Sequence, residues 1–202
     1  MEFEVIYDDQ DQAGRIAARA NLARVHVGLV DRVHKLCLVL DAPELEGSGF
    51  WQCEDDGPGL TATLYGAPAD LLPEQSVYTR HHRSVTGTKV DIDLLRVDRW
   101  LHRNLLQLDD LLCGRVDPER VPGGSSAALQ ACWDVWTDGR LRTWQHPGLS
   151  LAERRALFLR TFSRGTPLLP RHWAVFHALW EGKLQGHEGL VEAVQSLPLL
   201  RC

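Results

Sequence analysis

The spacing of apolar side chains in the first half of the chain predicts a helix set among short strands. Residues 3–7 alternate between apolar and polar positions, which is typical of a strand. From about Asp11, apolar or small residues return every three or four positions, which favours a helix. The members of this stripe are Ile16, Ala20, Ala23, Val27, Val30 and His34. Because residues 24–30 also alternate, the later part of this helix is ambiguous.

The strongest strand signal follows a loop expected over residues 41–49. Residues 50–54 and 60–65 flank the segment Asp-Asp-Gly-Pro-Gly, whose residue types favour a tight turn. The pattern therefore predicts a β-hairpin. We expect a further strand near residues 76–81.

The second half of the chain has helical periodicity throughout. Apolar positions between residues 91 and 113 recur every three or four residues and predict a long helix, with Gly114 as its stop. Ser150 and Glu153 have the spacing of a capping box, which predicts the start of another helix. Three further helices are expected from similar signals: one capped by Ser125 or Ser126, one from Pro170 to Gly182, and a short one over residues 190–197.

These elements predict an α+β fold, in which a small N-terminal sheet with a hairpin packs on a helical C-terminal half. With 202 residues, of which 44% are apolar and 24% charged, the chain has the length and composition of a single globular domain over residues 1–202. Its β-containing part covers about residues 1–90 and its helical part about residues 91–200.

Charge and composition exclude several classes of protein. The net charge of −5 supplies no basic surface for nucleic acid, and no apolar run approaches the ~18 residues of a membrane helix. The acidic first ten residues lack the pattern of a signal peptide. The five cysteines include no C-x-x-C pair, which argues against disulfides or a zinc ribbon. We therefore expect a cytoplasmic protein, and the use of only three lysines among 22 basic residues favours a bacterial source.

Nine histidines invite a search for a metal site, but no two of them are four positions apart. None therefore forms the His-x-x-x-His pair of a zinc-binding helix. The long helix does carry a polar line beside its leucine stripe, which includes Asp98, His102 and Asp109. Asp98 can hydrogen-bond His102 across one turn. This line is either a polar helix edge beside the core or a row of ligands.

Residues 102–109 resemble the active helix of zincin-like metallopeptidases, which carries H-E-x-x-H and, in some branches, x-x-D after it. His102 and Asp109 match the first and last ligands of that motif. Arg103 stands in place of the general-base glutamate, and Leu106 stands in place of the second histidine.

Two further features agree with this resemblance, which covers about residues 10–142. The segment from Trp133 to Asp138 resembles a W-N-x-x-x-D segment found downstream in some such proteins. The expected N-terminal helix and hairpin also fit the zincin layout.

The resemblance implies a zinc centre of which His102 and Asp109 are vestiges. Leu106 cannot coordinate a metal, and Arg103 cannot take a proton from zinc-bound water because it stays charged at any working pH. We therefore predict a non-catalytic domain with no cofactor and with a binding or assembly role. The alternative is a metal-dependent hydrolase, such as a zinc peptidase, whose ligands come from other positions.

A magnesium-dependent hydrolase is a second form of that alternative. Asp134 and Asp138 are one turn apart on a predicted helix, and Asp109 and Asp110 end the preceding one. Facing carboxylates of this kind can hold Mg²⁺ with a substrate phosphate. The competing interpretation is a solvated face on which Asp138 pairs with Arg142.

The helical half also contains six of the seven tryptophans. We expect most of them in the core, because each indole buries a large apolar area. Trp144 follows the end of a predicted helix and is the one most expected to be exposed. It is our candidate anchor for a protein partner or for a second copy of the chain.

Overall fold

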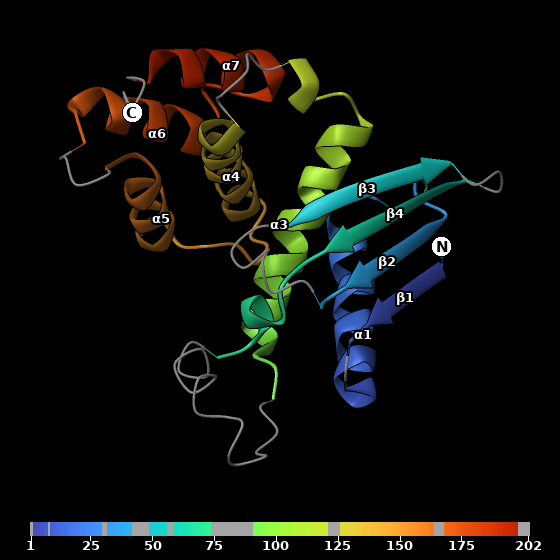
Figure 1. Ribbon diagram of the computed structural model, residues 1–202. Coiled ribbons are helices and arrows are strands. Elements are labelled where there is room, and N and C mark those ends of the chain that lie inside the picture. Colours follow the sequence, from blue (N-terminus) through green and yellow to red (C-terminus); the bar gives the residue numbers. More distant parts are fainter. Residues whose placement is uncertain are drawn as a thin grey trace. The chain divides into compact units, whose positions relative to one another are not determined.

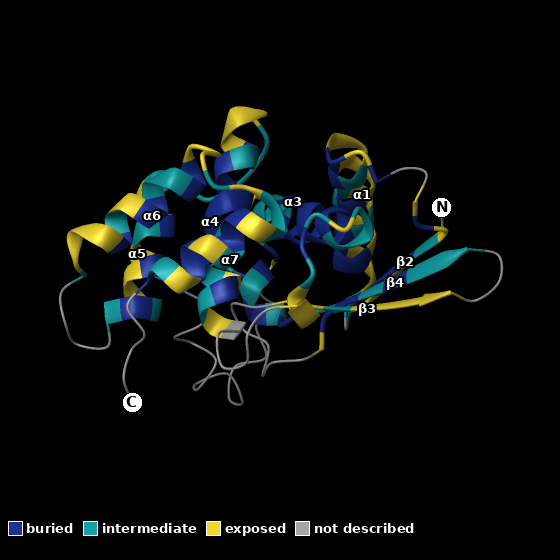
Figure 2. Ribbon diagram, turned by 90° about the horizontal axis from the view of Figure 1, so that it is seen from above, coloured by how far each residue is buried: buried dark blue, intermediate teal, exposed yellow. Residues whose placement is uncertain are grey.

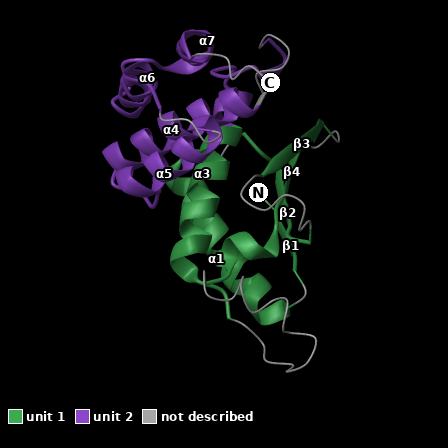
Figure 3. Cartoon of the chain, turned by 60° about the vertical axis from the view of Figure 1, so that its left-hand side comes forward, with its two compact units in different colours: residues 1–108 green, residues 109–202 purple. Residues whose placement is uncertain are grey.

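The computed structural model describes residues 2–7, 9–29, 32–41, 49–55, 59–73, 91–120, 126–163 and 168–197. The chain divides into two compact units, residues 1–108 and residues 109–202 (Figure 3). The first unit contains a mixed four-stranded sheet, and helices make up the second, so the expected α+β class is confirmed. The division falls inside one long helix, whereas the sequence pattern changes from β to helical near residue 90.

Four strands form the sheet of the first unit (Figure 1). They are β1 (Glu2–Ile6), β2 (Lys35–Val39), β3 (Phe50–Asp55) and β4 (Leu60–Tyr65). Their order across the sheet is β1-β2-β4-β3; the first three of these are parallel, and β3 is an antiparallel edge strand. The predicted first strand and the hairpin are therefore confirmed. The strand expected over residues 76–81 and most of the loop expected over residues 41–49 lie outside the described residues.

Helix α1 (Gln10–His26) joins β1 to β2. The carboxylate of Asp9 caps its start by accepting the backbone N–H of Asp11 at 3.0 Å. Gly28 follows the helix with a φ of 77°, a left-handed conformation that glycine adopts without strain. The expected continuation of the helical stripe to His34 is wrong, because the chain turns at this glycine and then enters β2.

Strand β2 is the element that the sequence pattern misses. Its residues form the run Lys-Leu-Cys-Leu-Val, and the three central ones are buried. Consecutive side chains of a strand point to opposite faces of the sheet, and here the three central ones are buried on both faces, so the strand shows no apolar–polar alternation. The short apolar run after the helix end was the available signal.

Side chains on the two faces of the sheet differ in burial, and Figure 2 shows helix α1 on one of these faces. Helix α1 lies against one face, where the apolar side chains of the two central strands are at most 1% exposed. These side chains are Leu36, Leu38, Ala62 and Leu64. On the opposite face, Ile6 and Phe50 are 47% and 56% exposed. Burial of one face by a helix is what makes this small sheet stable.

The long predicted helix is confirmed as α3 (Leu94–Leu112), which starts in the first unit and ends in the second. The carboxylate of Asp93 accepts a backbone N–H of its first turn at 2.9 Å. Gly114, with a φ of 64°, follows its end as expected. In the first unit, the ring of Trp100 lies so close to Gly66 that an added Cβ there would collide with it.

Four further helices belong to the second unit. They are α4 (Ser126–Thr143), α5 (Leu151–Ser163), α6 (Pro170–Trp180) and α7 (Gly186–Ser196). The capping box of α5 is confirmed, with Ser150 N donating to Glu153 Oε2 at 2.8 Å and Glu153 N donating to Ser150 Oγ at 3.3 Å. Helix α7 begins earlier than expected, and the side chains proposed to cap α4 lie outside the described residues. None of the described helices combines the length and the apolar character needed to cross a membrane.

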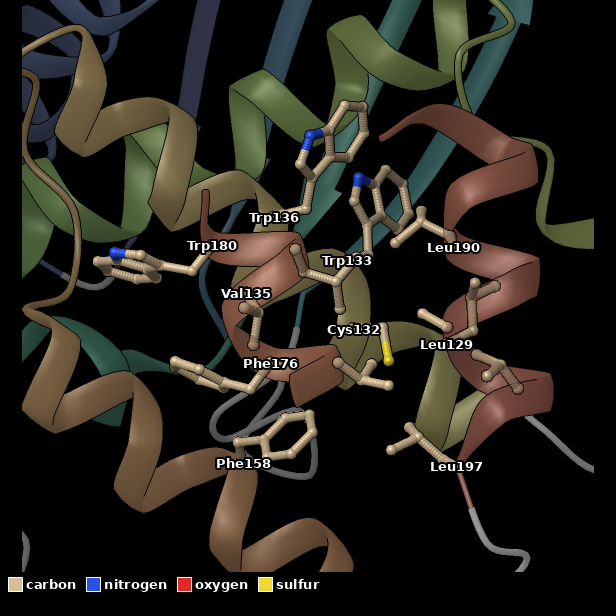
Figure 4. Packing of buried hydrophobic residues seen from close by; sticks show 14 of the residues in the cluster. Leu129, Cys132, Trp133, Val135, Trp136, Phe158, Phe176, Trp180, Leu190 and Leu197 are labelled. Atoms are coloured by element: carbon tan, nitrogen blue, oxygen red, sulfur yellow. The ribbon is translucent and has the colours of Figure 1, made fainter. Parts of the chain in front are cut away.

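Aromatic and aliphatic side chains of these four helices meet in the core of the second unit (Figure 4). Phe176 stacks on Trp180 with ring centroids 6.1 Å apart and meets Phe158 edge-on at 5.3 Å. Trp133 and Trp136 are 5% and 4% exposed. The expectation that most tryptophans are core residues is confirmed.

Candidate functional site

His102 is a buried residue in the part of α3 that belongs to the first unit, and only 1% of its surface is exposed. Its Nδ1 is 2.7 Å from the backbone carbonyl oxygen of Asp98, and its Nε2 is 2.9 Å from Nδ1 of His26. The expected contact with Asp98 is therefore made by the main chain. The Asp98 carboxylate instead accepts a hydrogen bond from Arg19 Nη1 at 3.0 Å. Sequence reasoning missed His26, because 76 positions separate it from His102.

Asp109, the other residue that the sequence resemblance suggests as a vestigial ligand, lies in the second unit and is 7% exposed. Its carboxylate forms a salt bridge with Arg115 and lies 3.6 Å from the Cys113 Sγ. An arginine therefore already supplies the positive charge that a metal would bring to this carboxylate.

The residues of the broken motif do not fit the zinc centre of a hydrolase. Leu106, at the position of the second ligand, is 0% exposed and has no donor atom. Arg103 is a cation at the position of the general base, and Asp109 is engaged by another cation. A catalytic zinc needs three protein ligands, and this segment offers a single histidine in their place.

Asp110, the next residue along α3, is the centre of a buried ion-pair network and is 0% exposed. Its carboxylate accepts hydrogen bonds from Arg115 Nε at 2.8 Å, Arg140 Nη1 at 2.8 Å and the Trp133 indole at 2.9 Å. Burial lowers the pKa of Arg115, but the hydrogen bond and charge of Asp110, together with Asp109, outweigh burial and raise it. Arg115 therefore keeps its positive charge at any working pH.

Asp134 and Asp138 meet a single buried cation, Arg154 of α5, which is 3% exposed. Arg154 donates to Asp138 from Nε at 2.6 Å and to Asp134 from Nη1 at 3.0 Å. Burial lowers the pKa of Arg154, and the charges of both carboxylates outweigh burial and raise it. The expectation of a solvated carboxylate face is wrong, since Asp138 is 1% exposed.

The sequence contained an indirect signal for this ion pair. Arg154 occupies a position of the apolar stripe of α5, between Leu151 and Phe158 at steps of three and four residues. A charged residue on a core-facing stripe needs a buried partner of opposite charge, because an unpaired buried charge is very costly.

Trp144 is 46% exposed, so the expected exposure of this residue is confirmed. Its indole meets the His146 ring edge-on at a centroid distance of 6.5 Å, and the Arg140 guanidinium lies 6.0 Å from its centroid. These neighbours hold an exposed aromatic side chain in a defined position.

The second unit also contains an open pocket of about 700 Å³ between residues 114–120 and the start of α7. It carries basic and acidic side chains in similar number, among them Arg120, which pairs with Asp117 at 3.6 Å. The pocket therefore has no net charge preference that would define a ligand.

No family model, curated protein or solved structure matches this chain.

Proposed function

We propose that this chain is a non-catalytic, zincin-like domain with a binding or assembly role. The zincin-like part of the proposal rests on the resemblance in residues 102–109, where His102 and Asp109 match two positions of the motif. An N-terminal helix and a β-hairpin precede the helix that carries His102, an order compatible with that layout.

The observation that carries the proposal is that the residues at two motif positions are not available to a metal ion. Leu106 is part of the apolar interior, and the carboxylate of Asp109 forms a salt bridge with Arg115. Restoring a zinc ligand set would require removing an arginine from a buried carboxylate, which leaves a costly unpaired charge.

Contacts between arginines and carboxylates also argue against a magnesium-dependent hydrolase. Asp110, Asp134 and Asp138 all accept hydrogen bonds from arginine side chains rather than presenting open oxygens. Mg²⁺ sites in proteins need carboxylate oxygens that remain free for the ion and its waters.

Two exposed features favour a binding role. The aromatic side chain of Trp144 is exposed and held by its neighbours, and such residues often anchor protein interfaces. The edge strand β3 exposes most of its side chains, including Phe50, and edge strands are common templates for pairing with another chain.

A peptidase assay tests the proposal. Protein purified without chelators is incubated with Zn²⁺ and an unfolded polypeptide such as reduced casein, beside the variant His102→Gln. We expect no turnover above the protein-free background in either sample. Zinc-dependent turnover by the wild type that His102→Gln abolishes would overturn the proposal, provided that circular dichroism shows the variant to be folded.

A nucleotide-hydrolysis assay with Mg²⁺ completes this test. The wild type is compared with Asp134→Asn, which removes one of the carboxylates needed by the magnesium mechanism. We expect no hydrolysis by either protein, and Mg²⁺-dependent hydrolysis lost in the variant would contradict the proposal.

A further inference from the structure

The first unit brings two histidines together from distant parts of the chain. The His26 ring at the end of α1 and the His102 ring on α3 have centroids 5.2 Å apart and planes inclined by 38°. Their nearest nitrogens, Nδ1 of His26 and Nε2 of His102, are 2.9 Å apart. Each ring therefore directs a nitrogen toward the same small volume.

The partner of the other His102 nitrogen determines the chemistry of this pair. The carbonyl oxygen of Asp98 can only accept, so the His102 Nδ1 at 2.7 Å carries the proton. Neutral His102 then has its lone pair on Nε2, facing His26. Histidines that bind metals are oriented in this manner, with one nitrogen on the ion and the other donating to a carbonyl or carboxylate.

An ion pair lies beside the turn of α3 that precedes His102. The charge of Arg19 next to this turn of α3 is offset by the Asp98 carboxylate at 3.0 Å. The second carboxylate oxygen, Asp98 Oδ1, is buried and has no hydrogen-bond partner among the described residues. Asp98 lies four positions before His102 on α3, so this acceptor oxygen belongs to the helix turn next to the histidine.

We propose that His26 and His102 are two ligands of a transition-metal site that takes a borderline divalent ion such as Zn²⁺, Ni²⁺ or Cu²⁺. Imidazole nitrogen is a preferred ligand of these ions. Two nitrogens bound tetrahedrally at about 2.0–2.1 Å are about 3.3 Å apart, so the pair has to open by roughly 0.4 Å. His26 is exposed and can make this movement, and water or another donor fills the remaining positions.

This site goes beyond the proposed function and is independent of the broken motif, because His26 lies outside residues 102–109. The ion would join the end of α1 to α3 and stabilise the folded unit, since it binds the folded chain in preference to the unfolded one. A hydrolase is not required for such a role.

Metal titration of the tag-free protein tests the proposal. We expect calorimetry in a non-chelating buffer to give one Zn²⁺ per chain, and His26→Ala to weaken binding at least about tenfold. His34→Ala is the matched control, because His34 is an exposed histidine of the same unit and should leave the affinity unchanged. His102→Gln should lose binding as well, and His26→Ala keeps the test valid if that buried substitution unfolds the protein.

Electron paramagnetic resonance of the Cu²⁺-loaded protein supplies a second readout. We expect nitrogen hyperfine structure from at least two imidazoles in the wild type, and from one fewer in His26→Ala. Replacing each of the other seven histidines identifies any further imidazole ligand. Absence of binding in the wild type, or equal affinity in His26→Ala, would overturn the proposal. Zn²⁺ binding without peptidase turnover would leave the proposed function intact. Peptidase turnover would overturn the proposed function but not the metal site.

Discussion

At the scale of single residues, arginines of the second unit form ion pairs with the aspartates that the sequence suggested as metal ligands. Asp110 is the most buried of the carboxylates concerned and contacts both Arg115 and Arg140. The Arg140 guanidinium also lies 3.7 Å from the centroid of the Trp136 ring, so the network is both ionic and aromatic. Removing one partner of such a buried pair typically costs about 3–5 kcal/mol. These carboxylates therefore stabilise the fold through ion pairs instead of binding a metal ion.

Cys132 is a buried group for which pH has a predictable effect. It is 0% exposed in the core of the second unit, and burial, with a smaller effect of the Asp134 charge, raises the pKa of its thiol to about 12. Above the ordinary thiol pKa of 9.0, the unfolded chain loses this proton while the folded chain keeps it. The free energy of unfolding should therefore fall as pH rises from 9.0 toward about 12, by up to about 1.4 kcal/mol per pH unit.

Urea unfolding at several pH values, under reducing conditions, measures this effect. Cys132→Val removes the titrating group and keeps an apolar side chain of similar size. Its unfolding free energy should depend less steeply on pH than that of the wild type. Identical pH slopes for the two proteins would mean that the buried thiol makes no such contribution.

At the scale of elements, local signals predicted much of the structure. The Ser150–Glu153 capping box, Pro170 at the start of α6 and the left-handed Gly182 after its end all act within one turn of chain. The hairpin was predictable for the same reason, since its strands are neighbours in sequence. Strand β2 was not, because its pairing with β1 and β4 is long-range and its burial removes alternation.

A close contact between two helices of the second unit gives a prediction at this scale. Gly139 lies inside α4, and a Cβ added there would collide with the backbone carbonyl of Trp180 at the end of α6. Gly139→Ala gains up to about 1 kcal/mol of helix propensity. The collision with rigid backbone is larger, so we expect a net loss of about 1–3 kcal/mol in the free energy of unfolding.

Gly14→Ala is the matched control for this substitution. Gly14 lies on α1, and an added Cβ would meet nothing within 4 Å. This change should stabilise the protein by about 0.5–1 kcal/mol. Thermal or urea unfolding of both variants measures the two effects, and stabilisation by Gly139→Ala would contradict the close helix contact.

At the scale of the whole molecule, the exposed side chain of Trp144 gives a prediction about self-association. We predict that the wild type self-associates in a concentration-dependent manner and that Trp144→Ala weakens this association at least tenfold. A tryptophan that anchors an interface as a hot spot carries about 2 kcal/mol or more of binding energy. Leu169→Ala is a control, since Leu169 is 54% exposed in the same unit. Sedimentation velocity over a range of concentrations measures the association. A wild type that sediments as a monomer throughout would exclude self-association through Trp144.

Sequence patterns predicted several residues of the candidate site but not the residues that contact them. The sequence singled out His102, Asp109, Asp134 and Asp138 from helical spacing and, for the first two, from the motif resemblance, and it identified Trp144 as exposed. It did not predict their partners. Arg154 lies 16 positions from Asp138, and Arg140 lies 30 positions from Asp110, so no local pattern joins either pair.

The sequence by itself determined the class of the fold and most of its elements, because periodicity, caps and turn residues act over a few neighbouring positions. The tertiary structure alone decided what the polar side chains do. It pairs the buried carboxylates of Asp110 and Asp138 with arginines and joins His26 to His102 across 76 positions. The physical reason is that a buried polar group takes its partner from whichever element packs against it, and packing is a long-range property of the chain.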